Sequence, residues 1–143
     1  MIHNGPPHHS NETYSYAKRM IDVLNRAYNK QYGRKYISVI PVNIYGPHDN
    51  FNLEQAHVIP AIIHKCFLAK KNGDSLKLSG SGKPLRQFIY SEDLAILTLY
   101  IVQSYEETSP IILSDNENNE HSIKTAADII RNNFSYNKEI KVL

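Results

Sequence analysis

Short β-branched runs alternate with longer helical patterns along most of this chain. Residues 36–42 read Y-I-S-V-I-P-V and residues 110–114 read P-I-I-L-S, both mostly apolar. Helical patterns cover residues 11–32, 57–72, 92–105 and 122–134. Helices that connect apolar strands are typical of parallel sheets with helices on their faces. The sequence therefore predicts an α/β fold.

The ends of these elements follow from capping and turn residues. Ser10 or Asn11 can cap the first helix, and Gly33 is a natural stop for it. Pro41 lacks an N–H, so the strand at 36–42 should end there. Two short strands, 75–79 and 86–90, are predicted on either side of a glycine turn, and residues 43–56 are predicted to be a loop.

Composition narrows the class of protein further. The chain has 143 residues, 41% of them hydrophobic and 21% charged, which is typical of one soluble globular domain. A net charge of +2 gives no argument for nucleic-acid binding. No apolar run approaches the ~20 residues of a membrane helix. The single cysteine, Cys66, is predicted to be buried and inert, and a lone thiol fits the cytoplasm.

Tyr14 and Lys18 form the first candidate site. They lie four residues apart in the predicted helix 11–32, so both side chains leave the same helix face. A cation beside a phenol favours the phenolate, which makes Tyr14 a candidate proton donor. Tyr16 lies nearby, and a chance Tyr–Lys spacing on a helix remains the alternative interpretation.

Three further features could carry chemistry. The loop Asn43–Phe51 leaves the carboxyl end of strand 36–42, where doubly wound sheets bind ligands. His57 opens a helix whose N-terminus disfavours an imidazolium, so it could accept a proton. Arg86 follows the glycine turn, and its guanidinium suits phosphate. The alternatives are a solvated turn, a capping or surface histidine, and an exposed arginine. The remaining histidines show no metal-ligand spacing, so no metal site is predicted.

Four segments together resemble the GDP-L-fucose synthase family of extended short-chain dehydrogenases/reductases. They read Y-S-Y-A-K-R-M, P-V-N-I-Y-G-P-H-D-N-F, H-V-I-P-A-I-I-H-K and G-S-G-K-P-L-R-Q-F-I-Y-S-E-D-L-A. The Tyr-x-x-x-Lys spacing and the R-x-F-I pattern are shared across extended members. The G-P-H-D-N-F and H-V-I-P segments are much more specific to the fucose enzymes.

The resemblance implies a two-part reaction on a GDP-bound sugar. The family epimerises C3 and C5 of GDP-4-keto-6-deoxy-D-mannose and then reduces C4 with NADPH to give GDP-L-fucose. Tyr14 would protonate the C4 oxygen, Lys18 would hold the nicotinamide ribose, and His57 would be the acid/base of epimerisation.

The resemblance also assigns binding residues. Tyr14, Lys18 and His57 would contact the cofactor, together with Pro41, Val42, Asn43 and Ile44 at the end of the strand. The GDP-sugar would be contacted by Asn43, Lys65, Ser79 and Arg86. The family has a tryptophan where this chain has Ser79, and the indole of that tryptophan would pack against the substrate.

The resemblance further implies a partial Rossmann-type doubly wound parallel sheet with part of a smaller C-terminal substrate-binding domain. Residues 1–50 would be the C-terminal part of the NADP-binding domain. Residues 51–143 would be mainly the nucleotide-sugar region, with elements around 92–114 returning to the Rossmann sheet. Helix 11–32 would lie in a homodimer interface.

The family's Gly-rich cofactor turn, catalytic serine and epimerising cysteine do not occur in this chain. We therefore expect a carboxyl-side portion of such an enzyme that lacks reductase activity as given. Two alternatives stay open. One is another extended epimerase, reductase or dehydratase acting on a nucleotide sugar. The other is a non-catalytic fragment that binds a ligand or forms dimers.

Overall fold

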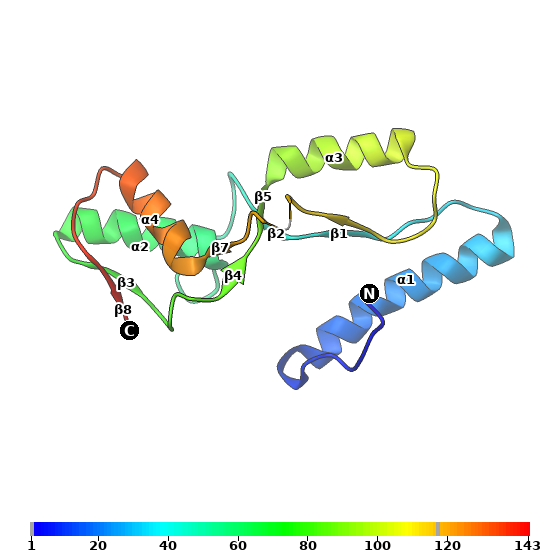
Figure 1. Cartoon of the computed structure of the whole chain (residues 1–143), viewed down its shortest axis with the longest axis horizontal. Coiled ribbons are helices and arrows are strands. Elements are labelled where there is room, and N and C mark those ends of the chain that lie inside the picture. Colours follow the sequence, from blue (N-terminus) through cyan, green and yellow to red (C-terminus); the bar gives the residue numbers. More distant parts are fainter. Residues whose placement is uncertain (1, 117) are drawn as a thin grey trace. The chain divides into compact units, whose positions relative to one another are not determined.

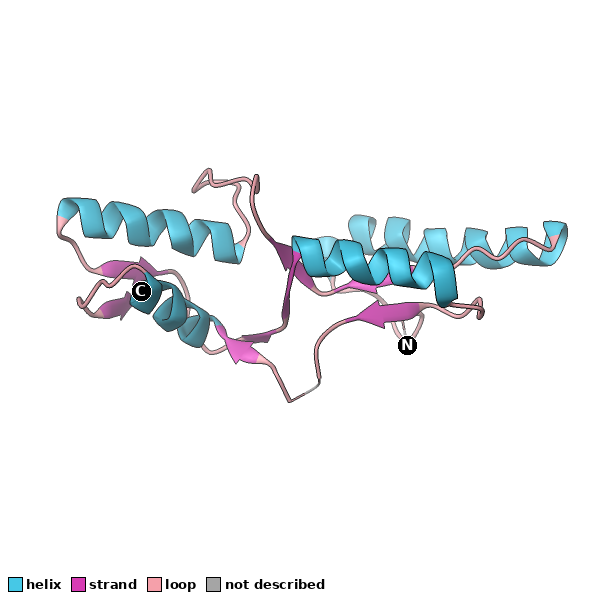
Figure 2. Ribbon diagram, turned by 90° about the horizontal axis from the view of Figure 1, so that it is seen from above, coloured by secondary structure: helices cyan, strands magenta, loops and turns pink. Residues whose placement is uncertain are grey.

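The computed structural model describes residues 2–116 and 118–143 (Figure 1). Its helices are η1 (His9–Asn11), α1 (Glu12–Tyr32), α2 (Val58–Asn72), α3 (Ser91–Ser104) and α4 (Ile123–Asn133). Its strands are β1 (Val39–Pro41), β2 (Asn43–Tyr45), β3 (Leu76–Leu78), β4 (Leu85–Arg86), β5 (Phe88–Tyr90), β6 (Ile111–Leu113), β7 (His121–Ser122) and β8 (Ile140–Val142). Figure 2 shows how short the strands are beside the helices.

Helix α1 has the predicted bounds, but its N-cap residue Asn11 makes no side-chain capping hydrogen bond. It ends at Gly33, which has a left-handed φ of 62° and donates its N–H to the Asn29 carbonyl at 3.0 Å. A glycine adopts this conformation without the steric penalty of a side chain. The apolar stripe of the helix is exposed in this structure, with Met20 and Leu24 each about half accessible. The one buried residue of α1 is Asp22.

Strand β1 is shorter than the predicted strand 36–42. The backbone of Tyr36 is bonded on both sides to the Asn29 side chain, with Asn29 Nδ2 to the Tyr36 carbonyl at 2.8 Å and the Tyr36 N–H to Asn29 Oδ1 at 2.7 Å. A side chain of α1 thus satisfies backbone groups that a strand ladder would otherwise use. The prediction that the strand is buried on both faces is also wrong here, since Val39 and Ile40 are half-buried and Pro41 is exposed.

Two parallel pairs confirm the α/β prediction. β1 pairs with β6, with Val39 opposite Ile111, and β2 pairs with β5, with Asn43 opposite Phe88. The predicted loop at 43–56 therefore begins with a strand. The sequence did not reveal β2 because its partner lies more than 40 residues further along the chain.

The glycine turn is present, but the strands on either side of it do not pair with each other. Gly80 and Gly82 both have positive φ, at 80° and 67°. β3 pairs in parallel with β8, and β4 pairs antiparallel with β7. The run 86–90 is split, because β4 ends at Arg86 and β5 starts at Phe88 with a different partner strand. Both partner strands come from the C-terminal third of the chain.

A small core lies between α2, α4 and the β3–β8 pair. From α2 it takes Ile62, Cys66 and Ala69, at the spacing of one helix face. Leu76, Leu78, Ala127, Tyr136 and Ile140 complete it. The Tyr136 hydroxyl donates to the Ala69 carbonyl at 3.2 Å. Burial raises the pKa of the Cys66 thiol, which agrees with the predicted inert cysteine.

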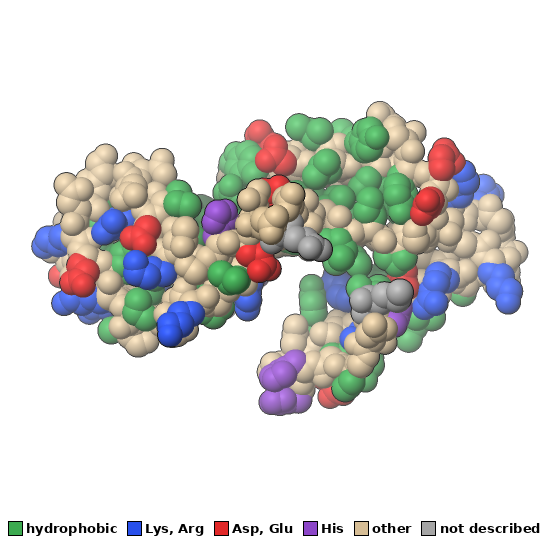
Figure 3. Space-filling model, in the orientation of Figure 1, with side chains coloured by type: hydrophobic (Ala, Val, Ile, Leu, Met, Phe, Trp, Pro, Cys, Tyr) green, Lys and Arg blue, Asp and Glu red, His purple; other side chains and the backbone are tan. Residues whose placement is uncertain are grey.

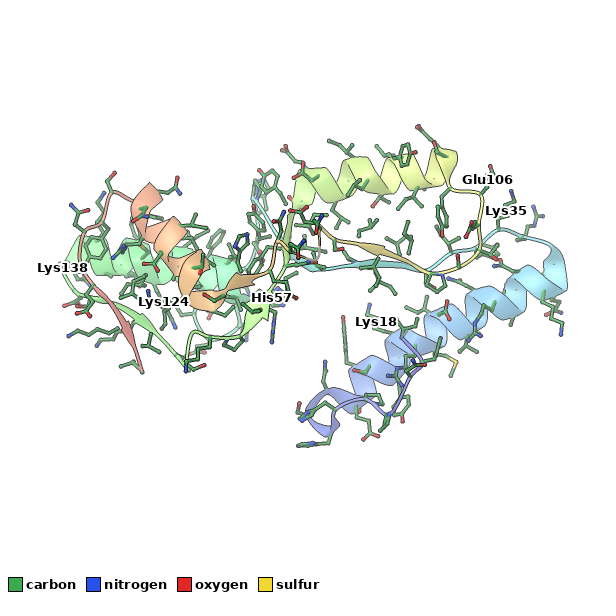
Figure 4. All side chains as sticks on the ribbon, in the orientation of Figure 1. Lys18, Lys35, His57, Glu106, Lys124 and Lys138 are labelled. Atoms are coloured by element: carbon green, nitrogen blue, oxygen red, sulfur yellow. The ribbon has the colours of Figure 1, made fainter. Side chains whose placement is uncertain are left out.

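The chain divides into two compact units. The first comprises Met1–Pro41 and Ile96–Leu113, and the second comprises Val42–Ala95 and Ser114–Leu143. An exposed ion pair between Lys35 and Glu106 joins the two segments of the first unit (Figure 4). Helix α3 carries exposed apolar side chains, visible in Figure 3, among them Ile96, Leu99, Tyr100 and Val102. Among the described residues, no helix is long and apolar enough to span a membrane.

Candidate active site

Tyr14 and Lys18 are adjacent on the surface of α1. Lys18 Nζ lies 5.4 Å from the centroid of the Tyr14 ring, within the range of a cation–π contact. Both side chains are exposed. Tyr16 is oriented differently, since its ring lies beside Arg19, with the guanidinium carbon 5.9 Å from the ring centroid. The structure therefore pairs Lys18 with Tyr14, the partner that the one-turn spacing predicts.

The four residues predicted at the cofactor lie between the end of β1 and the middle of β2. Pro41 ends β1, Val42 is half-buried, and Asn43 and Ile44 lie in β2 with exposed side chains. Asn43 Nδ2 donates to the Gln87 carbonyl at 2.9 Å, which fixes its amide at the start of the β2–β5 pair. Both strand pairs are parallel, so this segment lies at the carboxyl end of β1, where α/β folds place ligands.

The loop after β2 is ordered by its own side chains. Asn50 and Asn52 accept backbone N–H groups in consecutive turns, from Asn52 and Glu54 respectively, each at 2.9 Å. His64 of α2 lies with Nδ1 2.6 Å from the Phe51 carbonyl. A carbonyl only accepts, so Nδ1 carries the proton. His64 is one of the histidines without metal-ligand spacing, and no local sequence signal identifies this contact.

A mostly apolar cleft of about 290 Å³ lies beside this loop. It is lined by Tyr45, Gly46, Pro47, Asp49, Phe51, Ile59, Pro60, Ile63 and Tyr90. The Tyr45 and Tyr90 rings have centroids 5.6 Å apart across the β2–β5 pair. Residues of the two most specific sequence segments, G-P-H-D-N-F and H-V-I-P, therefore line the same cleft in the second unit.

Gly46 is required where this loop meets the start of α3. A Cβ at residue 46 would lie 2.9 Å from Ser91 Cβ and still closer to Ser91 Oγ. Such a contact forces the backbone or Ser91 to shift, at a cost of about 1–3 kcal/mol. We expect Gly46→Ala to lower the free energy of unfolding by that amount in urea denaturation followed by circular dichroism.

The matched control for this substitution is Gly46→Ala combined with Ser91→Gly, which removes the opposing side chain. The double variant should lose less stability than the sum of the two single variants. Equal stability of Gly46→Ala and the unaltered chain would show that the close approach of Gly46 and Ser91 is not a constraint.

His57 is the N-cap residue of α2. Its backbone carbonyl accepts the Ala61 N–H at 3.0 Å, while its imidazole makes no capping hydrogen bond in the described structure. The side chain, labelled in Figure 4, is exposed. The prediction of a side-chain cap is wrong, whereas an exposed imidazole agrees both with a ligand-binding histidine and with a surface histidine.

Two of the predicted substrate residues share one cleft. Lys65 of α2 and Ser79, which follows β3, both line an open cleft of about 300 Å³. Its other lining residues are Leu68, Ala69, Asn72, Asp74, Ser75, Lys77 and Leu143. The lining is mixed, with apolar residues beside two lysines and one aspartate. Lysine ammonium groups can bind phosphate, and apolar residues can contact a flat ring.

Arg86 lies in β4, outside the set of residues that line this cleft. Its Nη1 donates to the carbonyl of its neighbour Leu85 at 2.7 Å, and its side chain is exposed. The structure therefore groups Lys65 with Ser79 and leaves Arg86 on the antiparallel β4–β7 pair.

Residues 1–114 match the model of the NAD dependent epimerase/dehydratase family. The chain belongs to this family. The matched region includes the Tyr14–Lys18 pair, both strand pairs β1–β6 and β2–β5, and His57. The family match and the parallel pairs together confirm the predicted Rossmann-type α/β fold.

Two relatives of high identity are named as GDP-L-fucose synthases. The chain is 63% identical over 130 residues to a GDP-L-fucose synthase of Dictyostelium discoideum, covering 91% of this chain and 41% of the relative. It is 51% identical over 144 residues to a probable GDP-L-fucose synthase of Drosophila melanogaster, covering 96% of this chain and 45% of the relative. The chain therefore spans less than half the length of these curated relatives.

Solved structures agree with the family assignment. The crystal structure of a GDP-L-fucose synthetase from Naegleria fowleri superposes with a TM-score of 0.92 and 45% identity, covering 99% of this chain and 45% of that one. The NADP-bound form of that synthetase superposes with a TM-score of 0.89. The family description and this relative both point to a nicotinamide dinucleotide as the cofactor.

Proposed function

We propose that this chain supplies the proton donor and the sugar-binding elements of an enzyme that converts GDP-4-keto-6-deoxy-D-mannose to GDP-L-fucose. The observation that carries the reaction type is the Tyr14–Lys18 contact on the exposed face of α1. The choice of sugar rests on relatives named GDP-L-fucose synthase, one of them 63% identical over 91% of this chain.

The residues present fit a nicotinamide cofactor. An exposed phenol and ammonium lie together on α1, and the segment 41–44 at the end of β1 is exposed except for half-buried Val42. We propose that Lys18 donates hydrogen bonds to ribose hydroxyls and that Pro41, Val42, Asn43 and Ile44 line the nicotinamide side. The bound cofactor, NADPH by analogy with the NADP-bound relative, supplies the hydride for C4.

Tyr14 is proposed to deliver the proton that completes the reduction. Its hydroxyl would donate to the C4 oxygen as negative charge develops there, and Lys18 would stabilise the resulting phenolate. The two groups are held by a helix, so the donor is positioned before the substrate arrives, which suits proton transfer. Tyr14 would also contact the cofactor.

His57 is proposed to act in the epimerisation at C3 and C5. Protons beside the C4 ketone are acidic enough for a general base to remove, and a positioned imidazole can remove and return them. The imidazole of His57 is exposed at the start of α2 and does not cap it. His57 would also touch the cofactor.

The GDP-sugar is proposed to bind in the cleft that Lys65 and Ser79 line. Lys65 would offer a cation to the diphosphate, while apolar lining residues such as Leu68 would contact the base. Asn43 and Arg86 would contact other parts of the same ligand. Ser79 offers a hydroxyl where the family has an indole, so we expect a weaker stacking contribution at that residue.

The domain assignment is part of this proposal. Residues 1–50 would complete a nicotinamide-binding domain and residues 51–143 would be mainly a substrate-binding region. Pairing of β6 with β1 supports the return of the segment 92–114 to the first of these. We also propose a cytoplasmic location, which the reduced, buried Cys66 supports.

A chimeric enzyme tests the proposed function. In it, this chain replaces the matching segment of the full-length Dictyostelium discoideum relative. We expect the chimera to oxidise NADPH in the presence of GDP-4-keto-6-deoxy-D-mannose and to form GDP-L-fucose, followed by absorbance and by chromatography. A folded chimera that produces neither would contradict the proposal.

We propose in addition that helix 11–32 forms a homodimer interface. Met20, Leu24 and Tyr28 are about half exposed along one face of α1, and exposed apolar stripes of this kind mark association sites. Leu24→Lys should shift the chain from dimer to monomer in analytical ultracentrifugation, because it places a charge on that face. Phe67→Lys on α2, equally exposed, is the matched control and should leave the dimer intact. A dimer that survives Leu24→Lys would contradict this interface.

A further inference from the structure

Asp22 is the buried charge of α1, with 3% of its surface exposed. Its Oδ2 lies 2.7 Å from His3 Nε2 and 3.2 Å from Arg26 Nε. Its Oδ1 accepts the Ser38 hydroxyl at 3.2 Å. A buried carboxylate is retained only when such donors surround it. Nothing in the proposed reaction uses this group.

These contacts tie three segments of the first unit together. His3 belongs to the segment that runs beside α1 before η1, and a second bond, Arg19 Nη1 to the Gly5 carbonyl at 2.8 Å, holds the same segment. Ser38 immediately precedes β1. The Ser38 carbonyl in turn accepts the Ile111 N–H at 3.0 Å, so Ser38 links α1 to both strands of the β1–β6 pair.

The Asp22–Ser38 bond helps to set which level of α1 lies beside which level of β1. Asn25 Nδ2 donates to the same Ser38 hydroxyl oxygen at 3.1 Å, and the Asn29 side chain holds the Tyr36 backbone.

Tyr14, Lys18 and Asp22 follow one another at four-residue steps along one helix row. Tyr14 lies about 12 Å back along the axis from Asp22, at ~1.5 Å per residue. Pro41 lies about 10 Å forward from Ser38, at ~3.3 Å per residue.

The chain reverses direction between α1 and β1 (Figure 1), so these two displacements run the same way. The bond between Asp22 and Ser38 therefore brings Tyr14 level with Pro41. Those two residues are the proposed proton donor and the first residue of the proposed cofactor segment.

We infer that Asp22 is a positioning residue that holds the Tyr14–Lys18 pair in register with the end of β1 through Ser38. The inference rests on the proposed function for the roles of Tyr14 and Pro41. The contact with His3 keeps the N-terminal segment in place, and the contact with Ser38 carries the effect on the reaction.

The first test uses the 143-residue chain and amide hydrogen exchange. Ser38→Ala removes the hydroxyl that bonds Asp22 and leaves the Ser38 backbone in place. Exchange at Ile111 and Ile40 should become at least tenfold faster, while amides of β3 and α2 keep their rates. Asp22→Asn leaves the Asn25 bond to the same hydroxyl in place, so it should speed exchange at the same amides by a smaller factor. Unchanged exchange at Ile111 in both variants would overturn the inference without touching the proposed function.

The second test uses the chimeric enzyme and separates two readouts. Reduction is followed as NADPH oxidation, and epimerisation as deuterium uptake from solvent at C3 and C5. A misplacement of about 1 Å at a reacting centre can lower a rate on the order of 10²-fold. Ser38→Ala and Asp22→Asn should therefore slow reduction by up to that factor, while deuterium uptake, assigned to His57 in the other unit, stays near its original rate.

Three further variants separate a positioning role of Asp22 from a general structural role and from a failure of the proposed function. His3→Ala, which cuts only the N-terminal contact, should slow reduction less than Ser38→Ala, and the reverse order would overturn the inference. Asp128→Asn, on α4, should change neither readout. A parallel fall of both readouts in Ser38→Ala would show a general structural role and also overturn it. Tyr14→Phe with full reductase activity would instead contradict the proposed function itself.

Discussion

Tyr14→Phe should lower NADPH oxidation by the chimeric enzyme about 10²- to 10⁴-fold, the usual contribution of a positioned proton donor. Phenylalanine keeps the ring beside Lys18 but removes the hydroxyl, so the variant lacks only the group that donates a proton to the C4 oxygen. Deuterium uptake at C3 and C5 should continue, because that step is assigned to His57. The two rates are measured on the same sample by absorbance and mass spectrometry.

Tyr16→Phe is the matched control, since Tyr16 is the same residue type two positions away and lies beside Arg19. It should leave both rates unchanged. If Tyr16→Phe stopped reduction and Tyr14→Phe did not, Tyr16 and not Tyr14 would be the proton donor.

His57→Gln should produce the opposite pattern, with deuterium uptake at C3 and C5 slowed about 10²- to 10⁴-fold. Glutamine is similar in length and polar, but it cannot take up a proton at neutral pH. Reduction of a 4-keto sugar that already has the final C3 and C5 configuration should persist. Epimerisation is measured from the stereochemistry of the product and from its deuterium content.

His121→Gln serves as the control for this second experiment, since His121 lies in β7 and is exposed. Normal epimerisation by His57→Gln would remove His57 from the mechanism. Loss of both steps in His57→Gln would mean that the histidine holds the substrate in place for the two reactions alike.

Local signals in the sequence predicted the helices well. The stop of α1 at Gly33 and the cap of α4 at Ser122, whose Oγ accepts the Thr125 N–H at 3.0 Å, are contacts within a few residues. Their residues can be recognised because the partner is close in the chain. The Tyr14–Lys18 contact is of the same kind, one turn apart on one helix.

The partner of each strand could not be predicted from neighbouring residues in the sequence. β2 was read as loop, because three residues with no clear alternation become a strand only when β5 lies alongside. The partner of β3 is β8, more than 60 residues away, and not the strand that follows the glycine turn. Pairing of this kind depends on which edges meet after the helices have packed.

Asp22 and His64 show the same limit for the candidate site. No local pattern marked Asp22 as buried, because its donors His3 and Ser38 lie 19 and 16 residues away. The hydrogen bond of His64 to the Phe51 carbonyl had no signal at all. These contacts required the folded chain.

The sequence by itself determined the α/β class, the helix boundaries, the Tyr14–Lys18 pairing and the family resemblance. Each depends on residue type and on spacings of a few residues, which propensity and helix geometry translate directly into structure. The tertiary structure alone decided the strand partners, the shared cleft of Lys65 and Ser79, and the burial of Asp22 between α1 and β1. Those features arise from contacts between distant segments, which packing selects and no short window of sequence contains.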